Sequence, residues 1–340
     1  MTDPNRPRPA LARAAAFLRR LTGKLFRRGA PVPPPPPRPV PLAEPMESGV
    51  FAGDSGSLSY RLFVPKGAAA GPRPLLVMLH GCTQSPEDFA VGTRMNRLAE
   101  EAGCLVLYPE QTSAANDRKC WNWFNPDHQR RERGEPALIA GATRQVLAER
   151  GADPRRVYVA GISAGGSAAM VLATTHPDLF AAVGVHSGLP YGSATGVPSA
   201  LLAMKAGSSP GQRPAAGAPV VPAIVFHGDA DKVVHPRNGH HVMAQATANA
   251  EGLTAKSENG QAPGGRAFTR TVHTDRGGAA LFEQWIIHGS GHAWSGGSPD
   301  GSYTDPQGPD AAREMLRFFL SHRHAASAKP AKPAKPAKSA

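Results

Sequence analysis

The sequence of 340 residues contains no apolar run long enough to cross a bilayer. A membrane-spanning helix needs about 20 consecutive apolar residues. The apolar run nearest the N-terminus, AAAFL, meets Arg19 and Arg20 at once, whereas a secretory signal needs roughly 7–15 apolar residues. We therefore expect a cytoplasmic protein that stays inside the cell, with export from the cell as the alternative.

Cysteine is also scarce. The chain has only Cys82, Cys104 and Cys120, which are too few for a small domain held together by disulfides. Hydrophobic residues make up 41% of the sequence, which is enough for one large domain with a core of its own. The composition thus excludes a disulfide scaffold and favours one large globular domain.

Acidic residues are rare at both ends of the chain. Residues 1–38 carry nine Arg and Lys against one acidic residue, while residues 39–321 are nearly neutral. Within residues 1–30, leucine and alanine recur at helical spacing opposite the basic residues, which predicts a basic amphipathic helix. Such a helix is suited to an anionic or lipid-coated surface, or else it packs as an ordinary helix.

Two low-complexity segments flank the central region. Residues 31–46 include PVPPPPPRPVP, which predicts a semi-rigid polyproline linker. Residues 325–340 include AKPAKPAKPAK, which predicts a disordered Lys-Pro-Ala tail. Lysines in this pattern can contact phosphate groups of nucleic acid, but a solvated tail is the simpler interpretation. A folded domain is therefore expected over residues 47–324.

Short apolar segments alternate with helical patterns across this domain. Strands are predicted at 58–65, 74–80, 104–110, 156–163, 181–187, 222–228 and 281–289. Helices are predicted at 87–102, 136–150, 164–176, 236–249 and 308–322. This alternation is typical of an α/β fold, with a mostly parallel central sheet and helices on both faces.

The motif GISAGG follows one of the predicted strands and precedes a helix of small residues. A G-x-S-x-G sequence in this position forms a nucleophile elbow, a strained turn that raises the serine hydroxyl above the sheet. Gly161 and Gly165 leave room for such a turn. Ser163 is therefore the candidate nucleophile, and a tight turn without chemistry is the alternative.

A serine nucleophile needs a base and an acid, which follow it in this fold. The strand AIVFHG leads into Asp229 and Asp231, and the strand QWIIHG leads into His288 and His292. We predict Asp231 as the acid, because it lies further beyond its strand, with Asp229 as the alternative. We predict His292 as the base, because His288 terminates its strand and fits a structural role.

The oxyanion of acyl transfer needs backbone N–H donors. Ala164, directly after the nucleophile, is one predicted donor, and Cys82, in the segment LHGCTQ after an early strand, is the other. Gly81 allows close approach of the backbone there. Together these residues outline a serine esterase that needs neither a metal nor a cofactor.

Six ordered motifs also resemble one known family. LHGCTQSPEDFA, LYPEQ, CWNWF, GISAGG, HGDADKVV and GSGHAWSGG are similar to segments of the polyhydroxybutyrate depolymerase-type esterases of the α/β-hydrolase superfamily. The resemblance implies a catalytic triad of Ser163, Asp231 and His292. It also implies hydrolysis of poly(3-hydroxybutyrate) or related short-chain polyhydroxyalkanoates.

The resemblance leaves three functions open. Because the chain departs from secreted members of the family at its ends, an intracellular role at a polymer granule is favoured. Similar catalytic domains act as feruloyl or acetylxylan esterases, which is the second hypothesis. The third is a granule- or DNA-associated binding protein with a vestigial hydrolase domain.

Aromatic residues and cysteines lie beside the predicted site in the sequence. Trp121, Trp123 and Trp294 are candidates to line a substrate groove, with core packing as the alternative. Cys82 and Cys120 each adjoin a site motif and would pair in an oxidising compartment. Cys104, inside a predicted strand, is expected to be a buried free thiol.

Overall fold

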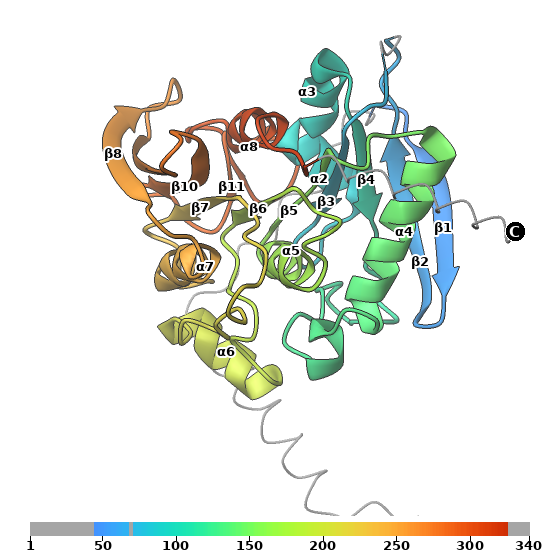
Figure 1. Ribbon diagram of the computed structural model, residues 1–340, viewed down its shortest axis with the longest axis horizontal. Coiled ribbons are helices and arrows are strands. Elements are labelled where there is room, and N and C mark those ends of the chain that lie inside the picture. The colour runs from blue at the N-terminus through green and yellow to red at the C-terminus, as the bar shows by residue number, and fades with distance from the viewer. Residues whose placement is uncertain (1–43, 68–70, 326–340) are drawn as a thin grey trace, which may run out of the picture. The chain divides into compact units, whose positions relative to one another are not determined.

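The computed structural model describes residues 44–67 and 71–325, which form an α/β domain (Figure 1). The predicted N-terminal helix, nearly all of the proline-rich linker and nearly all of the Lys-Pro-Ala tail lie outside the described residues. The strands are β1 (Glu47–Gly53), β2 (Gly56–Phe63), β3 (Leu75–Leu79), β4 (Leu105–Pro109), β5 (Val157–Ile162), β6 (Ala182–His186), β7 (Ala223–Gly228), β8 (Thr254–Gln261), β9 (Ala267–Thr274), β10 (Ala280–Ile287), β11 (Trp294–Ser295) and β12 (Thr304–Asp305). The helices are α2 (Pro86–Thr93), α3 (Met95–Ala102), the 3₁₀ helix η1 (Pro126–Gln129), α4 (Gly134–Arg150), α5 (Ala164–Thr175), α6 (Val197–Ala206), α7 (Arg237–Thr247) and α8 (Ala311–Leu320).

The central sheet has a parallel middle and antiparallel edges. Among the described residues its order is β1-β2-β4-β3-β5-β6-β7-β10-β9-β8. The strands from β4 to β10 in this order run parallel, while β1, β2, β8 and β9 join antiparallel. Parallel strands place their carboxyl ends at one edge of the sheet, where α/β proteins build their sites. The predicted fold class is confirmed.

The parallel strands are buried on both faces. Every residue of β3, β4, β5, β6 and β7 is buried, as expected for strands covered by helices on each side. One hydrophobic core contains residues of α4, α5 and α7, and a second contains residues of α2, α3 and α8. The two cores form the two layers of helices around the sheet that Figure 1 shows.

Helix boundaries follow local chemistry. The Ser85 side chain accepts a hydrogen bond from the Asp88 N–H at 3.2 Å, and Pro86 occupies the first turn of α2, which is a favourable helix start. The single helix predicted at 87–102 is instead two, because Arg94 adopts a φ of 57° and ends α2 with a left-handed cap. This turn redirects the chain from α2 into α3.

Two of the strands that the sequence did not predict, β1 and β8, form the edges of the large sheet. The strand β8, TAKSENGQ, is almost wholly exposed, and β1 is mostly exposed. Because neither buries a continuous face, neither shows the apolar alternation of a half-buried strand. The Gly- and Pro-rich segment 195–220 contains the helix α6. Within the described ranges, no helix combines the length and hydropathy of a membrane span.

Candidate active site

The predicted nucleophile, acid and base lie at the carboxyl edge of the parallel strands. Ser163 directly follows β5, Asp231 follows β7 by three residues, and His292 follows β10 by five. These strands lie close together in the order β5-β6-β7-β10. The topology therefore gathers at one edge three residues that the sequence separates by up to 129 positions.

The turn at Ser163 is strained. Its backbone has a φ of 58° and a ψ of −122°, a conformation that costs roughly 1–3 kcal/mol outside glycine. A Cβ on Gly161 would lie 2.4 Å from the Gly165 backbone, and a Cβ on Gly165 would lie 2.1 Å from the Leu79 carbonyl oxygen. Both glycines are therefore required for the serine to sit in this sharp turn, which has the backbone form expected of a nucleophile elbow.

Asp231 and His292 form a buried pair. His292 Nδ1 lies 2.7 Å from Asp231 Oδ2, and the Asp231 side chain is completely buried. The other carboxylate oxygen accepts hydrogen bonds from the N–H groups of Val233 and Val234 at 2.8 and 2.9 Å. With its carboxylate fixed at both oxygens, Asp231 can hold the His292 ring in one orientation.

The electrostatics of this pair keep the carboxylate ionised. Burial alone would raise the pKa of Asp231, but hydrogen bonds from His227, His292 and the Val234 N–H outweigh it and hold the pKa well below the ordinary value. His227 Nε2 lies 3.5 Å from Asp231 Oδ2. An ionised carboxylate at His292 Nδ1 leaves Nε2 as the ring nitrogen available for proton transfer.

The alternative acid, Asp229, pairs with the other histidine. His288 Nδ1 lies 2.8 Å from Asp229 Oδ2, and both side chains are more than two-fifths exposed. His288 Nε2 lies 3.0 Å from Thr269 Oγ1 on the neighbouring strand β9. Both nitrogens of His288 are thus engaged in structural contacts, as the prediction of a structural role requires.

A buried histidine holds the loop that carries His292. His186 Nε2 accepts a hydrogen bond from the Ser295 N–H at 3.0 Å, and its ring stacks on Trp294 at a centroid distance of 5.2 Å. Burial lowers the pKa of His186 to about 3, so the ring is neutral and can accept this bond. The role of His186 could not be predicted from the sequence, because a histidine at a strand end carries no distinguishing pattern.

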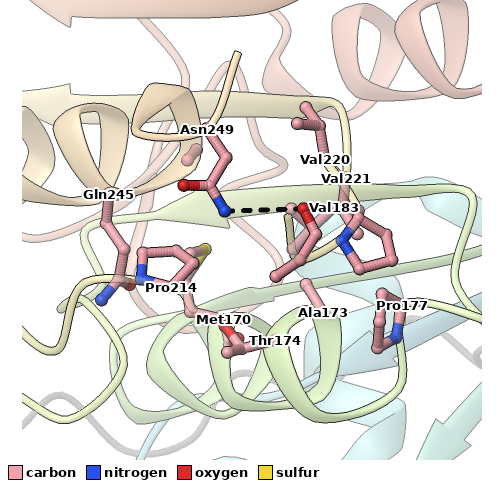
Figure 2. Close-up of a pocket in the computed structure, with 13 residues that line it drawn as sticks. Met170, Ala173, Thr174, Pro177, Val183, Pro214, Val220, Val221, Gln245 and Asn249 are labelled. Atoms are coloured by element: carbon pink, nitrogen blue, oxygen red, sulfur yellow. Dashed lines mark hydrogen bonds between the residues drawn. The ribbon is translucent and has the colours of Figure 1, made fainter. Parts of the chain in front are cut away.

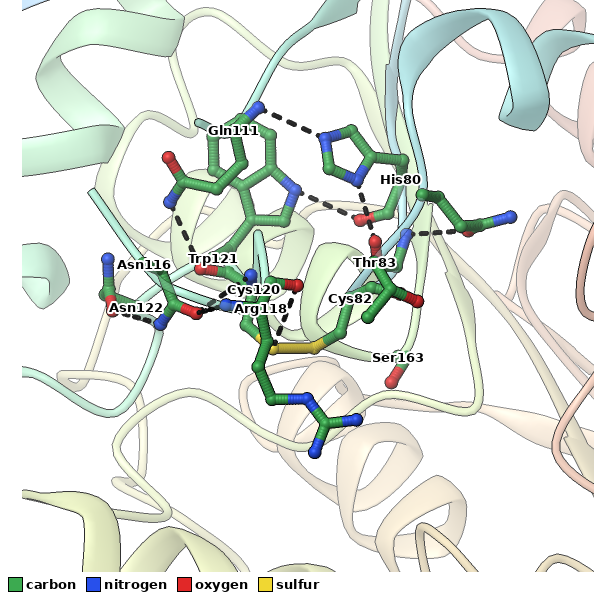
Figure 3. Close-up of a disulfide and its surroundings, with 12 residues drawn as sticks. His80, Cys82, Thr83, Gln111, Asn116, Arg118, Cys120, Trp121, Asn122 and Ser163 are labelled. Atoms are coloured by element: carbon green, nitrogen blue, oxygen red, sulfur yellow. Dashed lines mark hydrogen bonds between the residues drawn. A yellow bond between two sulfur atoms is a disulfide. The ribbon is translucent and has the colours of Figure 1, made fainter. Parts of the chain in front are cut away.

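The predicted oxyanion donors lie against the elbow. A Cβ on Gly81 would contact Ile162, the residue before Ser163, at 3.3 Å. Among the described residues, neither the Cys82 N–H nor the Ala164 N–H has a hydrogen-bond acceptor. Figure 3 shows Cys82 close to Ser163 and bonded to Cys120. The disulfide is therefore formed, and Cys104 is the buried free thiol that was predicted.

The three tryptophans do not line an open groove, which corrects the prediction. Trp121 is fully buried and donates through Nε1 to the His80 carbonyl at 3.1 Å, and Trp123 is also buried. Trp294 is only 1% exposed and packs between Phe89 and His186. Sequence proximity to a site motif did not reveal that these rings support the site loops from within the core.

One pocket of the described residues is lined by other residues than Ser163, Asp231 and His292. It borders the C-terminal half of α5, whereas Ser163 precedes the helix, and Figure 2 shows Asn249 above Ala173 and Thr174. The side-chain amide of Asn249 donates to the carbonyls of Ala215 and Ala218. In the part of the chain that the structure describes, no group of three or more His, Cys, Asp or Glu side chains is placed to hold a metal ion.

Comparison with known proteins gives the family. The family model "Esterase PHB depolymerase" matches residues 58–262. Poly(3-hydroxyalkanoate) depolymerase C from Paucimonas lemoignei is 34% identical over 254 residues, covering 71% of this chain and 60% of that protein. Feruloyl esterase B from Neurospora crassa is 29% identical over 234 residues, covering 63% of this chain and 76% of that protein.

A solved structure confirms the fold. An acetyl xylan esterase from Aspergillus awamori superposes with a TM-score of 0.64 at 18% identity, covering 82% of this chain and all of that one. The chain spans about three-fifths of the length of the depolymerase that it matches. Because the family model covers more than half of the chain, the chain belongs to the PHB depolymerase esterase family.

Proposed function

We propose that the protein is a serine esterase in which Ser163, His292 and Asp231 form the catalytic triad. The observation that carries this proposal is the buried Asp231–His292 pair, with a nitrogen–oxygen distance of 2.7 Å, at the sheet edge where the strained Ser163 turn lies. Asp231 fixes the His292 ring with its proton on Nδ1, which leaves Nε2 as the base.

The reaction proceeds in two halves. Ser163 Oγ attacks the ester carbonyl carbon while His292 Nε2 takes the hydroxyl proton, and the resulting oxyanion accepts hydrogen bonds from the Cys82 and Ala164 N–H groups. His292 then gives its proton to the departing alcohol oxygen as the carbon–oxygen bond breaks. In the second half, a water molecule gives a proton to His292 Nε2 and attacks the carbonyl carbon of the acyl-enzyme. The bond between this carbon and Ser163 Oγ then breaks, His292 returns the proton to Oγ, and the acid and free Ser163 are released.

We propose short-chain polyhydroxyalkanoate as the substrate. The match to the depolymerase family model and the name of the 34% identical relative support this choice. Docking to a granule through the basic N-terminal helix is the associated prediction, and that helix lies outside the described residues. The nucleic-acid alternative depends on the same undescribed ends and gains no support.

A feruloyl or acetylxylan ester is the second candidate substrate. The relative named feruloyl esterase B aligns over nearly as much of the chain as the depolymerase does. The two candidates share the triad chemistry and differ in the alcohol and acyl groups at the site. The choice between them is therefore a question of substrate, not of mechanism.

The compartment stays a prediction. A cytoplasmic or granule-associated location was favoured by the sequence, with an extracellular one as the alternative. The Cys82–Cys120 disulfide supports the alternative, because disulfides persist mainly in oxidising compartments.

The rate of ester hydrolysis by the Ser163→Ala variant tests the proposed mechanism. We expect kcat on p-nitrophenyl butyrate to fall by at least about 10⁴-fold, because the nucleophile is lost while the fold is kept. Ser257→Ala, at an exposed serine of the edge strand β8, is the matched control and should keep full activity. Normal turnover by a folded Ser163→Ala variant would reject the triad.

The substrate test uses the same pair of proteins. Release of 3-hydroxybutyrate from amorphous poly(3-hydroxybutyrate) granules is measured beside hydrolysis of methyl ferulate. Release from granules by wild type but not by Ser163→Ala supports the depolymerase proposal. Cleavage of the ferulate alone keeps the triad and replaces the polymer by the second substrate.

A further inference from the structure

One histidine lies directly behind the predicted oxyanion loop. His80 follows β3 and is only 1% exposed. Its Nδ1 lies 2.7 Å from the Gly81 carbonyl oxygen, and its Nε2 accepts a hydrogen bond from the Gln111 N–H at 3.1 Å. Neither the triad nor the oxyanion donors assign a role to this side chain.

The two contacts leave one arrangement of protons on the ring. The Gln111 N–H donates only to an unprotonated nitrogen, so Nε2 is the acceptor. A neutral imidazole then carries its proton on Nδ1, where it donates to the Gly81 carbonyl. Burial lowers the pKa of His80 to about 4, against a smaller opposing effect of the Gly81 hydrogen bond, which keeps the ring neutral at ordinary pH.

This hydrogen bond sets the plane of the peptide that joins Gly81 to Cys82. No cis peptide bond occurs among the described residues. In a trans peptide the carbonyl and the following N–H point in opposite directions within one plane. Because His80 holds the Gly81 carbonyl, the Cys82 N–H points away from His80. Figure 3 shows Cys82 between His80 and Ser163 in its view.

We propose that His80 is a positioning residue, which orients the Cys82 N–H toward the oxyanion by holding the Gly81 carbonyl through Nδ1–H. This role rests on the proposed serine esterase mechanism, in which that N–H is a donor. It separates two functions of one ring: Nδ1 acts on the oxyanion peptide, and Nε2 anchors the ring to the backbone at Gln111.

The surroundings of His80 make this orientation rigid. The Gln111 side chain donates to the buried Glu135 carboxylate at 2.5 Å and to the Cys120 carbonyl at 3.1 Å. Glu135 also accepts from the Asn122 N–H at 2.8 Å. The carboxylate thus fixes the segment that donates to His80 and carries the disulfide partner of Cys82.

The peptide on the other side of Gly81 is held separately. The Gly81 N–H donates to Gln84 Oε1 at 2.9 Å, and the Thr83 N–H donates to the Arg118 carbonyl at 2.7 Å. The Gly81 carbonyl also accepts a hydrogen bond from the Gln84 N–H at 3.3 Å, which is longer than the 2.7 Å contact with His80 Nδ1. Within the described part of the loop, the contact with His80 is therefore the one through which a side chain sets the direction of the free Cys82 N–H. Loss of that bond should turn the donor without unfolding the loop.

Two substitutions separate the two nitrogens of His80. In His80→Asn, the amide NH₂ takes the place of Nδ1–H and can still donate to the Gly81 carbonyl. In His80→Gln, the amide oxygen takes the place of Nε2 and can still accept from Gln111, but no donor remains at the position of Nδ1. Both variants lose the ring, so they share the packing defect and differ in the proposed contact.

The measurement is kcat and KM on p-nitrophenyl butyrate for both variants, with thermal unfolding as the check of folding. Removal of one oxyanion donor costs about 10²–10³ in kcat, and misdirecting it should cost about 10- to 100-fold. We therefore expect His80→Gln to lose about 10- to 100-fold in kcat at nearly unchanged KM. His80→Asn should keep kcat within about 3-fold of wild type.

A boronic acid gives a second readout of the same geometry. Butylboronic acid forms a tetrahedral adduct with the Ser163 oxygen, so its affinity should fall with kcat in His80→Gln and be kept in His80→Asn. Equal kcat losses in the two variants, or a change confined to KM or stability, would overturn the proposal. Failure of the triad itself would show separately, as turnover by Ser163→Ala.

Discussion

The loops after β7 and β10 form two Asp–His pairs, which have the same composition but differ in burial and in the contacts of the histidine. Asp231–His292 is buried, with the Asp231 side chain fully enclosed, whereas Asp229–His288 is largely exposed. The nitrogen–oxygen distances are nearly equal, at 2.7 and 2.8 Å. Distance alone therefore does not distinguish the pair that we propose as catalytic from the pair that we propose as structural.

Burial and the contacts of the histidines make the distinction. Both aspartates accept further backbone N–H groups, Asp231 from Val233 and Val234 and Asp229 from Gly289, so the difference lies in burial and in the second nitrogen of each histidine. In the other pair, His288 uses its second nitrogen toward Thr269, which joins strand β10 to strand β9 at the rim. A buried carboxylate with a fixed partner orients a base, while an exposed pair with both nitrogens engaged only links two elements.

Replacing each aspartate by asparagine tests this difference most strongly. Asp231→Asn should lower kcat by about 10⁴-fold, because the amide favours the wrong tautomer of His292 while leaving the geometry nearly intact. The measurement is hydrolysis of p-nitrophenyl butyrate at neutral pH.

Asp229→Asn is the matched control, because it makes the same chemical change two residues earlier. Asp229 lies outside the proposed triad, and its exposed contact with His288 contributes little to stability. We therefore expect kcat to stay within about 2-fold of wild type. If the two variants lost activity equally, the burial of Asp231 would not be what selects the acid, and the alternative assignment of Asp229 would return.

The loop that carries Cys82, a predicted oxyanion donor, is held by a disulfide, whereas Asp231 is held by burial and hydrogen bonds. The Cys82–Cys120 disulfide closes a loop with a sequence separation of 38 residues. In the chain-entropy treatment, such a loop stabilises the fold by about 4 kcal/mol. We expect Cys120→Ser to lower the free energy of urea unfolding by about 2–4 kcal/mol and to lower kcat by about 10-fold.

The control for the disulfide is Cys104→Ser, at the buried free thiol on the other face of the sheet. It removes one sulfur without opening a loop, so any loss of stability should leave kcat unchanged. A Cys120→Ser enzyme with the stability and kcat of wild type would show that the hydrogen bonds of the loop hold Cys82 by themselves.

The sequence could predict the backbone framework of the site better than its side-chain support. The strands that lead to Ser163, Asp231 and His292 were predicted within two residues. The strands β5 and β7 are fully buried and therefore form continuous apolar runs, while β10 is only partly buried. The order of the motifs then placed the three residues at one sheet edge. Both steps depend on local patterns that the amino-acid sequence displays directly.

The parts that were missed depend on contacts between distant segments. His80, Gln111 and Glu135 meet across 55 residues of sequence, and no local pattern marks any of them as partners. Trp121 and Trp294 were assigned to a groove, since adjacency in sequence does not give the direction of a side chain. Only the packing of the loops shows that both rings face the core.

The smallest expected effect is on the pH dependence of stability. It concerns His186, the buried histidine that holds the loop of His292. Burial lowers the pKa of His186 to about 3, below the ordinary value of about 6.5. Between these two pH values His186 is therefore protonated in the unfolded chain and neutral in the folded chain. The contribution of neutral His186 to the free energy of unfolding is therefore fully present above about pH 6.5 and is lost as the pH falls toward 3. For His186 alone the loss between pH 7.5 and 5.5 is about 1 kcal/mol.

Urea unfolding of His186→Gln at these two pH values isolates that contribution. The glutamine oxygen can replace Nε2 as acceptor for the Ser295 N–H, but it does not titrate, so the variant should lose about 1 kcal/mol less than wild type on acidification. Equal slopes for wild type and His186→Gln would mean that the ring does not stay neutral when the loop of His292 is folded, and the difference between the two pairs would then rest on Asp231 alone.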